Sequence, residues 1–341
     1  MAIPIPPSEK RPKVTLSPIA EPKGLSSAEI SSIAGKLIAN VEKVIVGKHE
    51  QVVLVTAVWL AEGHLLIEDV PGVAKTMLAR AMAQSGGCTF KRIQCTPDLQ
   101  PSDVLGETYV DQESGRTEFR FGPLFSQFVL VDEINRASPR TQSALLEAMG
   151  EAMVTAGNVT YRLQKPFMVV ATQNPIEQEG TFLLPEAQKD RFLMRMNLGY
   201  PSLADEKQMV ERFQLRHPME TLQPVTTPDG ITKCQEAVRK VNVPSEVCDY
   251  ILKIVRTTRE HPALLLGSSP RGSLGLFRAA QAMAAIGGTD SVTAAQVKDL
   301  AQKVLVHRLI VRREDKYRNT KVEDVFAEIL GQIPVPEAPA R

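Results

Sequence analysis

The sequence predicts an α/β domain with a parallel sheet flanked by helices, followed by a smaller all-helical domain. Short apolar runs alternate with helical stretches between residues 65 and 172, a pattern typical of parallel strands that are buried on both faces. After residue 201 only helical patterns follow. The 341 residues are enough for about two domains of roughly 150 residues each.

Each element is predicted from its own local pattern. Four apolar runs are predicted strands, at residues 65–67, 90–94, 128–131 and 167–172. Helices are predicted at residues 26–44, 49–61, 76–84 and 141–149, and then at 205–214, 230–241, 245–260, 271–286 and 293–307. Two segments of alternating residues, 110–121 and 154–163, are predicted to be hairpins inserted into the α/β frame.

The chain divides into four predicted regions. Proline is concentrated at both ends, so we predict flexible tails at residues 1–25 and 331–341, for which a proline-rich docking peptide is the alternative interpretation. The α/β domain is predicted at residues 26–200 and the helical domain at 201–330, with the boundary near Pro201. Ser26 and Glu29 have the spacing of a capping box, which predicts that the first helix begins there.

Charge and cysteine content exclude several classes of protein. Lys and Arg total 40 and Asp and Glu total 39, so the chain has no overall positive field for nucleic acid or anionic lipid. The four cysteines have neither zinc-finger nor disulfide-framework spacing, which favours a reducing compartment. The most apolar run, residues 52–60, is too short to span a bilayer, and the N-terminus lacks signal-peptide features. We expect a cytoplasmic protein without an integral membrane segment.

A candidate phosphate-binding loop follows the first predicted strand. Residues 68–76 read EDVPGVAKT and lie between a strand and a helix, the order in which backbone N–H groups and a helix N-terminus face phosphate in P-loops. In this role Lys75 contacts the β- and γ-phosphates of ATP, and the Thr76 hydroxyl binds Mg²⁺. The predicted nucleotide-binding residues in this segment are Pro71, Gly72, Val73, Ala74, Lys75, Thr76 and Met77.

The loop departs from the usual P-loop motif at two positions. Asp69 stands in place of the first glycine and Ala74 in place of the second. A carboxylate beside phosphate is repulsive unless it is turned away, and alanine is less free than glycine in unusual backbone conformations. Taken alone, the segment is equally consistent with an ordinary turn.

Polar residues end the third and fourth predicted strands. Asp132 and Glu133 have the Walker B arrangement, in which Asp132 holds Mg²⁺ and Glu133 orients and polarises the attacking water. A solvated pair of acids is the alternative, which the upstream loop disfavours. Asn174 follows the next strand, where its amide can donate to the γ-phosphate or to the water; a simple turn before proline is the alternative.

Three long runs closely resemble the MoxR family of AAA+ ATPases. They are VDEINRASPRTQSALLEAM at residues 131–149, ATQNPIEQEGT at 171–181 and LPEAQKDRF at 184–192, and the likeness extends over roughly residues 30–312, including GSSPR at 267–271 and HRLI at 307–310. The resemblance implies a P-loop AAA+ domain followed by a helical lid. It also implies a hexameric ring that binds ATP and Mg²⁺ at subunit interfaces.

The resemblance gives roles to further residues. Arg191 resembles the arginine finger that reaches the γ-phosphate of a neighbouring subunit, and Arg271 resembles the second sensor that reports the γ-phosphate to the lid. A local ion pair with Asp190 or Glu186 is the alternative for Arg191, and a solvated position at a helix start is the alternative for Arg271. Val46 and Gly47 stand where the family forms its adenine pocket, and the hairpin at 154–163 resembles an insert in the family's second helix.

The resemblance also implies what such a protein acts on. The family remodels, matures or activates other protein complexes in a chaperone-like way, sometimes by metal insertion, together with partners that carry von Willebrand factor A domains. One alternative is a nucleotide-gated binding scaffold that hydrolyses little ATP. A nucleic-acid-dependent motor is a weaker alternative because of the near-neutral charge, so we expect neither nucleic acid nor membrane as a partner.

Overall fold

The computed structural model describes residues 24–110, 112, 115–156, 159–174, 181–213, 218–312 and 320–336. Most of the predicted N-terminal tail, residues 1–23, and the end of the predicted C-terminal tail, residues 337–341, lie outside the described residues. Within the described ranges, none of the helices combines the length and the apolar character that crossing a membrane requires.

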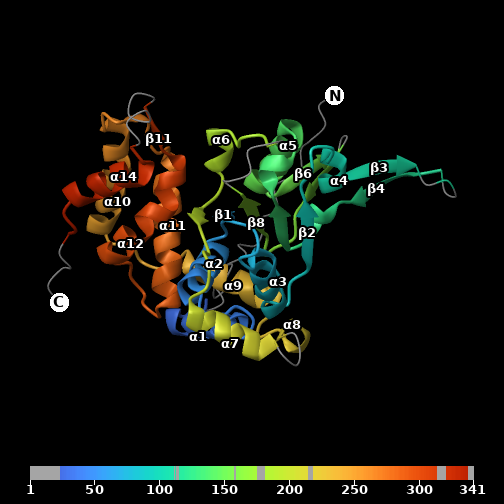
Figure 1. The fold of residues 1–341 in the computed structure, drawn as a ribbon, viewed down its shortest axis with the longest axis horizontal. Helices are drawn as coiled ribbons and strands as arrows, with labels where there is room; N and C mark the ends of the chain where they lie inside the picture. The colour runs from blue at the N-terminus through green and yellow to red at the C-terminus, as the bar shows by residue number, and fades with distance from the viewer. Residues whose placement is uncertain are drawn as a thin grey trace, which may run out of the picture.

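A five-stranded parallel sheet forms the centre of the molecule, in the order β2–β5–β8–β1–β9 (Figure 1). The strands are β1 (Leu65–Glu68), β2 (Phe90–Gln94), β5 (Phe128–Asp132), β8 (Met168–Gln173) and β9 (Met194–Met196). The four predicted strands are confirmed. Strand β9 is an additional edge strand, and its three residues, Met-Arg-Met, are too few to stand out as an apolar run.

Helices cover both faces of this sheet. Phe128 and Leu130 of β5 belong to one buried cluster, whereas Val129 and Val131 belong to the other. The helices of the first cluster include α1 (Ser27–Val41), α2 (His49–Leu60) and α3 (Lys75–Ser85), and those of the second are α4 (Pro101–Leu105) and α5 (Pro139–Glu151). Burial on both faces explains why the strands are continuous apolar runs, and it confirms the α/β class.

Helix α1 begins where its capping box predicts. The Ser26 hydroxyl accepts a hydrogen bond of 3.3 Å from the backbone N–H of Glu29, and the Glu29 carboxylate accepts one of 2.8 Å from the N–H of Ser26. These two bonds satisfy backbone donors that a helix start otherwise leaves unpaired. The helix then buries Ile30, Leu37 and Val41 against the core.

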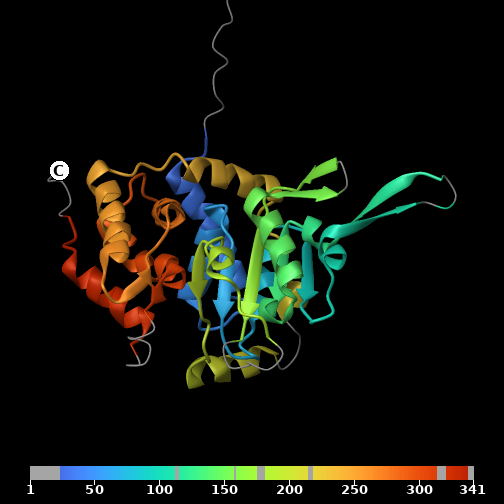
Figure 2. The ribbon, with the colours of Figure 1, turned by 90° about the horizontal axis from the view of Figure 1, so that it is seen from above.

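Two antiparallel hairpins are inserted into this frame, as predicted. They are β3 (Gly106–Val110) with β4 (Thr117–Phe121), and β6 (Met153–Ala156) with β7 (Val159–Arg162). The β3–β4 hairpin extends away from the body of the molecule in both views (Figures 1 and 2). It follows α4, the helix after the second core strand, whereas β6–β7 follows α5. The resemblance implies that residues 154–163 are an insert in the second helix of the family's α/β core. This assignment is wrong, because the hairpin follows α5, the helix after the third core strand.

The region after Pro201 is mostly helical, as predicted, with three additions. Its helices are α7 (Leu203–Phe213), α8 (Pro218–Thr221), α9 (Pro228–Val238), α10 (Ser245–Glu260), α11 (Pro270–Ile286), α12 (Ala294–Leu305) and α14 (Val322–Gln332). Helix α8, helix α14 and a short antiparallel pair, β10 (Leu264–Leu266) with β11 (Ile310–Val311), are not among the predicted elements. Helices α10, α11, α12 and α14 lie at the end of the molecule opposite the β3–β4 hairpin (Figures 1 and 2).

The first part of this helical region is held against the α/β domain. The side-chain amide of Gln235, in α9, donates a 2.7 Å hydrogen bond to the carbonyl of Trp59, in α2. The backbone N–H of Val225 donates to the carbonyl of Ser85 at 2.9 Å. Helix α11 also packs on α1 and α2. The division near Pro201 remains our proposal for the boundary between the domains.

Candidate nucleotide-binding site

The predicted phosphate-binding loop connects β1 to α3 and has two residues in the left-handed region. Gly72 has φ of +85°, and Ala74, the residue before α3, has φ of +63°. A left-handed conformation costs an alanine about 1–2 kcal/mol, so the loop holds its bend against a local preference. Ala74 provides no side-chain cap to α3, which leaves the first N–H groups of the helix available to an anion.

Asp69, which replaces the first glycine of the motif, is turned away from the loop. Its carboxylate accepts hydrogen bonds from the N–H groups of Val70 at 2.8 Å, Leu198 at 2.6 Å and Gly199 at 2.7 Å. The side chain is buried. The carboxylate is therefore satisfied by the backbone after β9, and it does not oppose a phosphate in the loop.

Lys75 is the first residue of α3 and bends back over the loop. Its ammonium donates a 2.9 Å hydrogen bond to the carbonyl of Asp69. Because this partner is neutral, the positive charge is available to a phosphate group. Thr76 and Met77 follow in the first turn of the helix and are half-buried. The structure thus brings the predicted loop residues together in one turn between strand and helix.

Asp132 ends β5, and both of its carboxylate oxygens have partners. The Oδ1 atom accepts a 2.6 Å hydrogen bond from the Thr172 hydroxyl. The Oδ2 atom accepts from the guanidinium of Arg92, at 2.6 Å from Nη2 and 3.1 Å from Nε. One oxygen is thus fixed by the neighbouring strand, and the other already faces a positive charge.

Glu133 follows with a left-handed backbone, at φ of +56°. Its Oε2 atom accepts hydrogen bonds of 3.0 Å from the side-chain amide of Gln94 and from the guanidinium of Arg136. Its backbone N–H donates to the Thr172 hydroxyl at 2.9 Å. The carboxylate predicted to polarise water is therefore held by two side chains in this conformation.

Asn174 comes directly after β8 and is buried. Strand β8 lies between β1 and β5 in the parallel sheet. Since the carboxyl ends of parallel strands meet at one edge, Asn174 lies between the loop that follows β1 and the acids that end β5. The segment after it, residues 175–180, lies outside the described residues.

The donor groups at this edge fit Mg²⁺. The predicted ligands are the carboxylate of Asp132 and the hydroxyl of Thr76, and Mg²⁺ takes oxygen ligands, commonly one or two from the protein with the remainder from phosphate and water. The pairing of Oδ2 with Arg92 shows that a positive charge is accommodated there. Across the part of the chain that the structure describes, no cluster of three or more His, Cys, Asp or Glu could form a cage of protein ligands.

Val46 and Gly47 lie beside helix α7. A side-chain carbon at Gly47 would stand 2.2 Å from Cγ of Asp205, so the helix packs directly on the glycine backbone, whose φ is +69°. The ammonium of Lys48 donates to the carbonyl of Tyr200 at 2.9 Å. Residues 198–200, after β9, thus contact both Asp69 and Lys48. This brings the predicted adenine-pocket residues, Val46 and Gly47, near the phosphate-binding loop.

Arg191 lies at the opposite edge of the sheet. The N–H of Leu193 donates to the carbonyl of His64 at 2.8 Å, which places Arg191 at the amino end of β1 and β9. Lys75, in contrast, follows the carboxyl end of β1. The structure therefore does not bring Arg191 to the phosphate-binding loop of its own chain.

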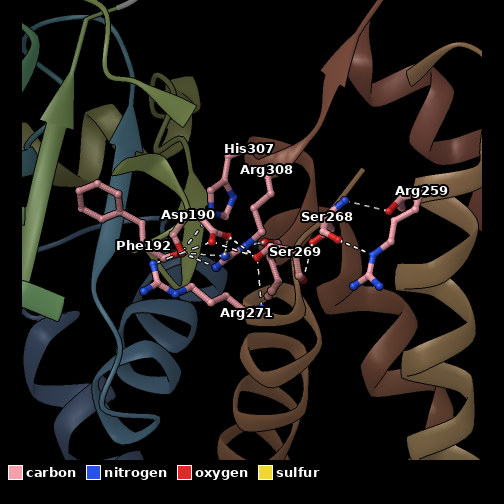
Figure 3. Close-up of polar contacts among 10 residues, drawn as sticks. Asp190, Phe192, Arg259, Ser268, Ser269, Arg271, His307 and Arg308 are labelled. Carbon is pink, nitrogen blue, oxygen red and sulfur yellow. Dashed lines mark hydrogen bonds and ion pairs between the residues drawn. The ribbon is translucent and has the colours of Figure 1, made fainter. Parts of the chain in front are cut away.

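Arg271 lies at the same edge as Arg191. Its Nη1 atom is 4.0 Å from Oδ2 of Asp190, and Ser269, which caps α11, donates to the same oxygen at 3.0 Å (Figure 3). Arg271, at the start of α11, thus lies beside an acid of its own chain. A cavity of about 300 Å³ at this edge is lined by several arginines, namely Arg191, Arg271, Arg278 and Arg308.

Comparison with known proteins decides the family. Residues 64–194 match the family described as "ATPase family associated with various cellular activities (AAA)", and residues 256–329 match the "AAA lid domain". The protein "Chaperone MoxR1" of Mycobacterium tuberculosis is 38% identical over 325 residues, covering 92% of this chain and 85% of that protein. The chain belongs to the MoxR family of AAA+ ATPases.

Two further proteins are similar to this MoxR-family chain over most of its length. YeaC of Bacillus subtilis is 45% identical over 308 residues, covering 90% of this chain and 96% of that protein. A crystal structure from Cytophaga hutchinsonii is 35% identical and has a TM-score of 0.85, covering 91% and 97% of the two chains. The predicted family, and the α/β domain with its helical lid, are thus confirmed.

Three polar residues of this MoxR-family site are not predicted from the sequence. Arg92 and Gln94 are alternate residues of β2, so they share one face of that strand, and Gln94 pairs in register with Asp132. Thr172 is the residue of β8 whose hydroxyl holds both acids. A polar i, i+2 pair on the strand beside the Walker B strand is the signal that could have revealed Arg92 and Gln94.

The thiol nearest the acids is unreactive. Burial, together with the negative charges of Asp132 and Glu133, raises the pKa of Cys95 to about 12. The thiolate is the reactive form of cysteine, so this side chain stays protonated at neutral pH.

Proposed function

We propose that this MoxR-family protein binds and hydrolyses ATP at the interfaces between its own copies. The observation that carries the proposal is the separation of the predicted groups: Lys75 and the acids lie at the carboxyl edge of the sheet, whereas Arg191 and Arg271 lie at the amino edge. A γ-phosphate held by one copy would meet these arginines only from a neighbour. This separation supports a homo-oligomer, for which we propose a hexameric ring.

The residues at the carboxyl edge have distinct roles in this proposal. Lys75 and the uncapped N–H groups of α3 bind the phosphates. Glu133 orients the attacking water and accepts its proton once the carboxylate leaves Gln94 and Arg136, and Asn174 positions the water or the γ-phosphate. When bound between Thr76 and Asp132, Mg²⁺ supplies charge neutralisation for the phosphate oxygens.

The arginines of the neighbouring copy complete the site. Arg191 donates to the γ-phosphate as negative charge develops in the transition state, a contribution on the order of 10³-fold or more in arginine-finger enzymes. Arg271 reports the presence of that phosphate to its own helix, α11. Loss of the phosphate releases both arginines and allows the interface to shift.

We propose that this cycle drives chaperone-like remodelling of partner protein complexes, with von Willebrand factor A domain proteins as partners. A chaperone is what the name of the relative from Mycobacterium tuberculosis says of that protein. The two hairpins support a contact face for clients. The ring of Phe119 stacks on that of Tyr161 at 4.8 Å, which joins the hairpins, and Phe121 beside them is exposed.

A nucleotide-gated scaffold remains the second candidate because Glu133 is held by Gln94 and Arg136. Steady-state ATPase measurements separate the two candidates. Glu133→Gln abolishes turnover, and Arg191→Ala lowers it strongly while the affinity for a fluorescent ATP analogue stays near that of the wild type. Wild-type turnover indistinguishable from zero in the assembled state, with tight ATP binding, would favour the scaffold.

A further inference from the structure

Arg308 of the lid binds the backbone on both sides of Arg191. It lies at the end of a short 3₁₀ helix, η3 (Val306–Arg308), and its side chain is 3% exposed. Its Nη1 atom donates to the carbonyl of Asp190 at 2.7 Å, and its Nη2 atom donates to the carbonyl of Phe192 at 2.6 Å (Figure 3). These are the carbonyls immediately before and after Arg191. One lid guanidinium thus fixes the backbone on both sides of the predicted finger.

The carboxylate of Asp190 extends the same unit to Arg271. It pairs with Arg308 through Oδ1 and accepts from the Ser269 hydroxyl at 3.0 and 3.1 Å. The Ser269 hydroxyl in turn accepts the backbone N–H of Arg271 at 3.1 Å, and the Arg271 side chain lies 4.0 Å from Asp190. The start of α11 and the residue before the finger therefore share one acid (Figure 3).

The chemistry of this unit calls for arginine. The Arg308 side chain donates in three directions, to Asp190, to Phe192 and, through Nε at 2.8 Å, to the carbonyl of Val304. A planar guanidinium has donors in a fixed fork, whereas a lysine ammonium is a point charge on a flexible stem. A buried charge is tolerated only when it is paired and hydrogen-bonded, and Asp190 meets that need.

We propose that Arg308 is a positioning residue that holds Arg191 and Arg271 as one unit for the nucleotide site of the adjacent copy. This inference rests on the proposed function. The consequence is that the lid of one copy controls the arginines that complete the site of its neighbour. This follows because a movement of η3 also moves the backbone around Arg191.

A purely structural role would make Arg308 a clamp between the lid and the sheet. Arg195 offers a matched control, because it also bridges the two parts of the chain: it pairs with Glu68 of β1 at 3.1 Å and with Glu323 of α14 at 2.7 Å. Among its described contacts, none involves residues 190–192. Removing Arg195 weakens the attachment of the lid but leaves the hydrogen bonds from Arg308 to the backbone around Arg191 in place.

The experiment separates a subunit that donates arginines from one that hydrolyses. Acceptor subunits carry Arg191→Ala. Donor subunits carry Glu133→Gln, so they bind ATP without turning it over, together with Arg308→Met, Arg308→Lys or the control Arg195→Met. The ATPase rate of each equal mixture is measured. We expect donors with Arg195→Met to restore activity nearly as well as Glu133→Gln alone, and donors with Arg308→Met to restore at least about tenfold less, given that small misplacements in catalytic sites cost on the order of 100-fold.

Equal restoration by the Arg308→Met donor overturns it, and so does an equal loss with Arg195→Met, which would make lid attachment the cause. Recovery with Arg308→Lys also overturns it, since a simple ion pair would then suffice. Failure of the Glu133→Gln donor alone is a failure of the proposed function instead.

The same donor variants are also tested for correct folding. Each donor is compared by thermal unfolding and by affinity for a fluorescent ATP analogue, which depends on its own carboxyl-edge site and not on its arginines. Asp190→Asn serves as the second variant if Arg308→Met unfolds. It keeps an acceptor for Ser269 but removes the charge that pairs with Arg308, and the same loss as a donor is expected; full donor activity would overturn the inference.

Discussion

The hydroxyl of Thr172 donates a 2.6 Å hydrogen bond to Oδ1 of Asp132. The same hydroxyl oxygen accepts the backbone N–H of Glu133 at 2.9 Å, so one side chain on β8 holds both acids at the end of β5. Thr172 is completely buried, and water cannot take its place without rearrangement. The positions of the predicted metal ligand and of the predicted base therefore depend on a residue of the neighbouring strand.

Replacing this hydroxyl is expected to impair hydrolysis. Thr172→Val keeps the volume but leaves Oδ1 of Asp132 and the N–H of Glu133 without a partner, which costs about 1–3 kcal/mol for each buried group. We expect turnover to fall by about tenfold or more, while Thr172→Ser retains most of it. Steady-state ATPase assays of the two variants measure this difference. Wild-type turnover in Thr172→Val would show that the hydroxyl does not hold the acids in the working enzyme.

The pairing of Arg92 with Asp132 predicts an effect on Mg²⁺. Arg92 occupies Oδ2 of Asp132, so the two cations compete for one oxygen. Because Arg92 is half-exposed, the pair is worth at most about 1 kcal/mol. Arg92→Met is therefore expected to lower the Mg²⁺ concentration for half-maximal nucleotide binding by a few-fold, with Lys91→Met, at an exposed position next to it, as the control. An unchanged or higher Mg²⁺ requirement contradicts the competition.

Restoring the usual glycine at residue 69 is expected to harm the loop. Asp69→Gly removes the acceptor for the N–H groups of Leu198 and Gly199, and it adds freedom to the unfolded chain. We expect a loss of about 1–3 kcal/mol in the free energy of unfolding, together with weaker nucleotide binding. Denaturant titration and a binding isotherm measure the two effects. A glycine variant that is as stable as the wild type and binds ATP more tightly would mean that the acid has no supporting role.

Buried His64 predicts how stability depends on pH. Burial lowers the pKa of His64 to about 4, from an ordinary value near 6.5. Its Nδ1 atom accepts the N–H of Val169 at 3.1 Å, which requires the neutral ring. Between pH 6.5 and 4 the unfolded chain binds a proton that the folded chain does not. The contribution of neutral His64 to the free energy of unfolding is therefore fully present above pH 6.5. It is lost as the pH falls towards 4, by about 3 kcal/mol in total.

A variant isolates this contribution. His64→Asn keeps an acceptor for Val169 but does not titrate, so the slope of the free energy of unfolding between pH 7 and 5 should become shallower. It should not vanish, because burial also lowers the pKa of His307. Identical slopes for His64→Asn and the wild type contradict a buried neutral His64.

Local signals predict the parts of the site that one strand and its following loop contain. The apolar runs predict four core strands, and the segment from Glu68 to Thr76 predicts the loop, because each pattern depends on neighbouring residues. Strand β9 has only three residues, and its place beside β1 depends on strand order. The orientation of the Asp69 carboxylate depends on contacts with residues about 130 positions away. No local pattern contains that information.

The sequence does not locate the two arginines within the fold. A motif assigns Arg191 and Arg271 a partner phosphate, but it does not say at which edge of the sheet they lie. That answer requires the parallel pairing of β9 with β1 and the packing of α11 against the start of β9. The role of Arg308 is likewise a contact across 116 to 118 positions, which appears only when the lid is in place.

The central claim is that one copy supplies the arginines for another, and subunit mixing tests it most directly. Arg191→Ala and Glu133→Gln are mixed at a series of ratios, and the ATPase rate is measured after the assembled species is confirmed by light scattering. We expect each variant alone to be nearly inactive and the rate to pass through a maximum at intermediate ratios. A rate that stays at the level of the separate variants at every ratio, in mixed assemblies, would contradict a shared site.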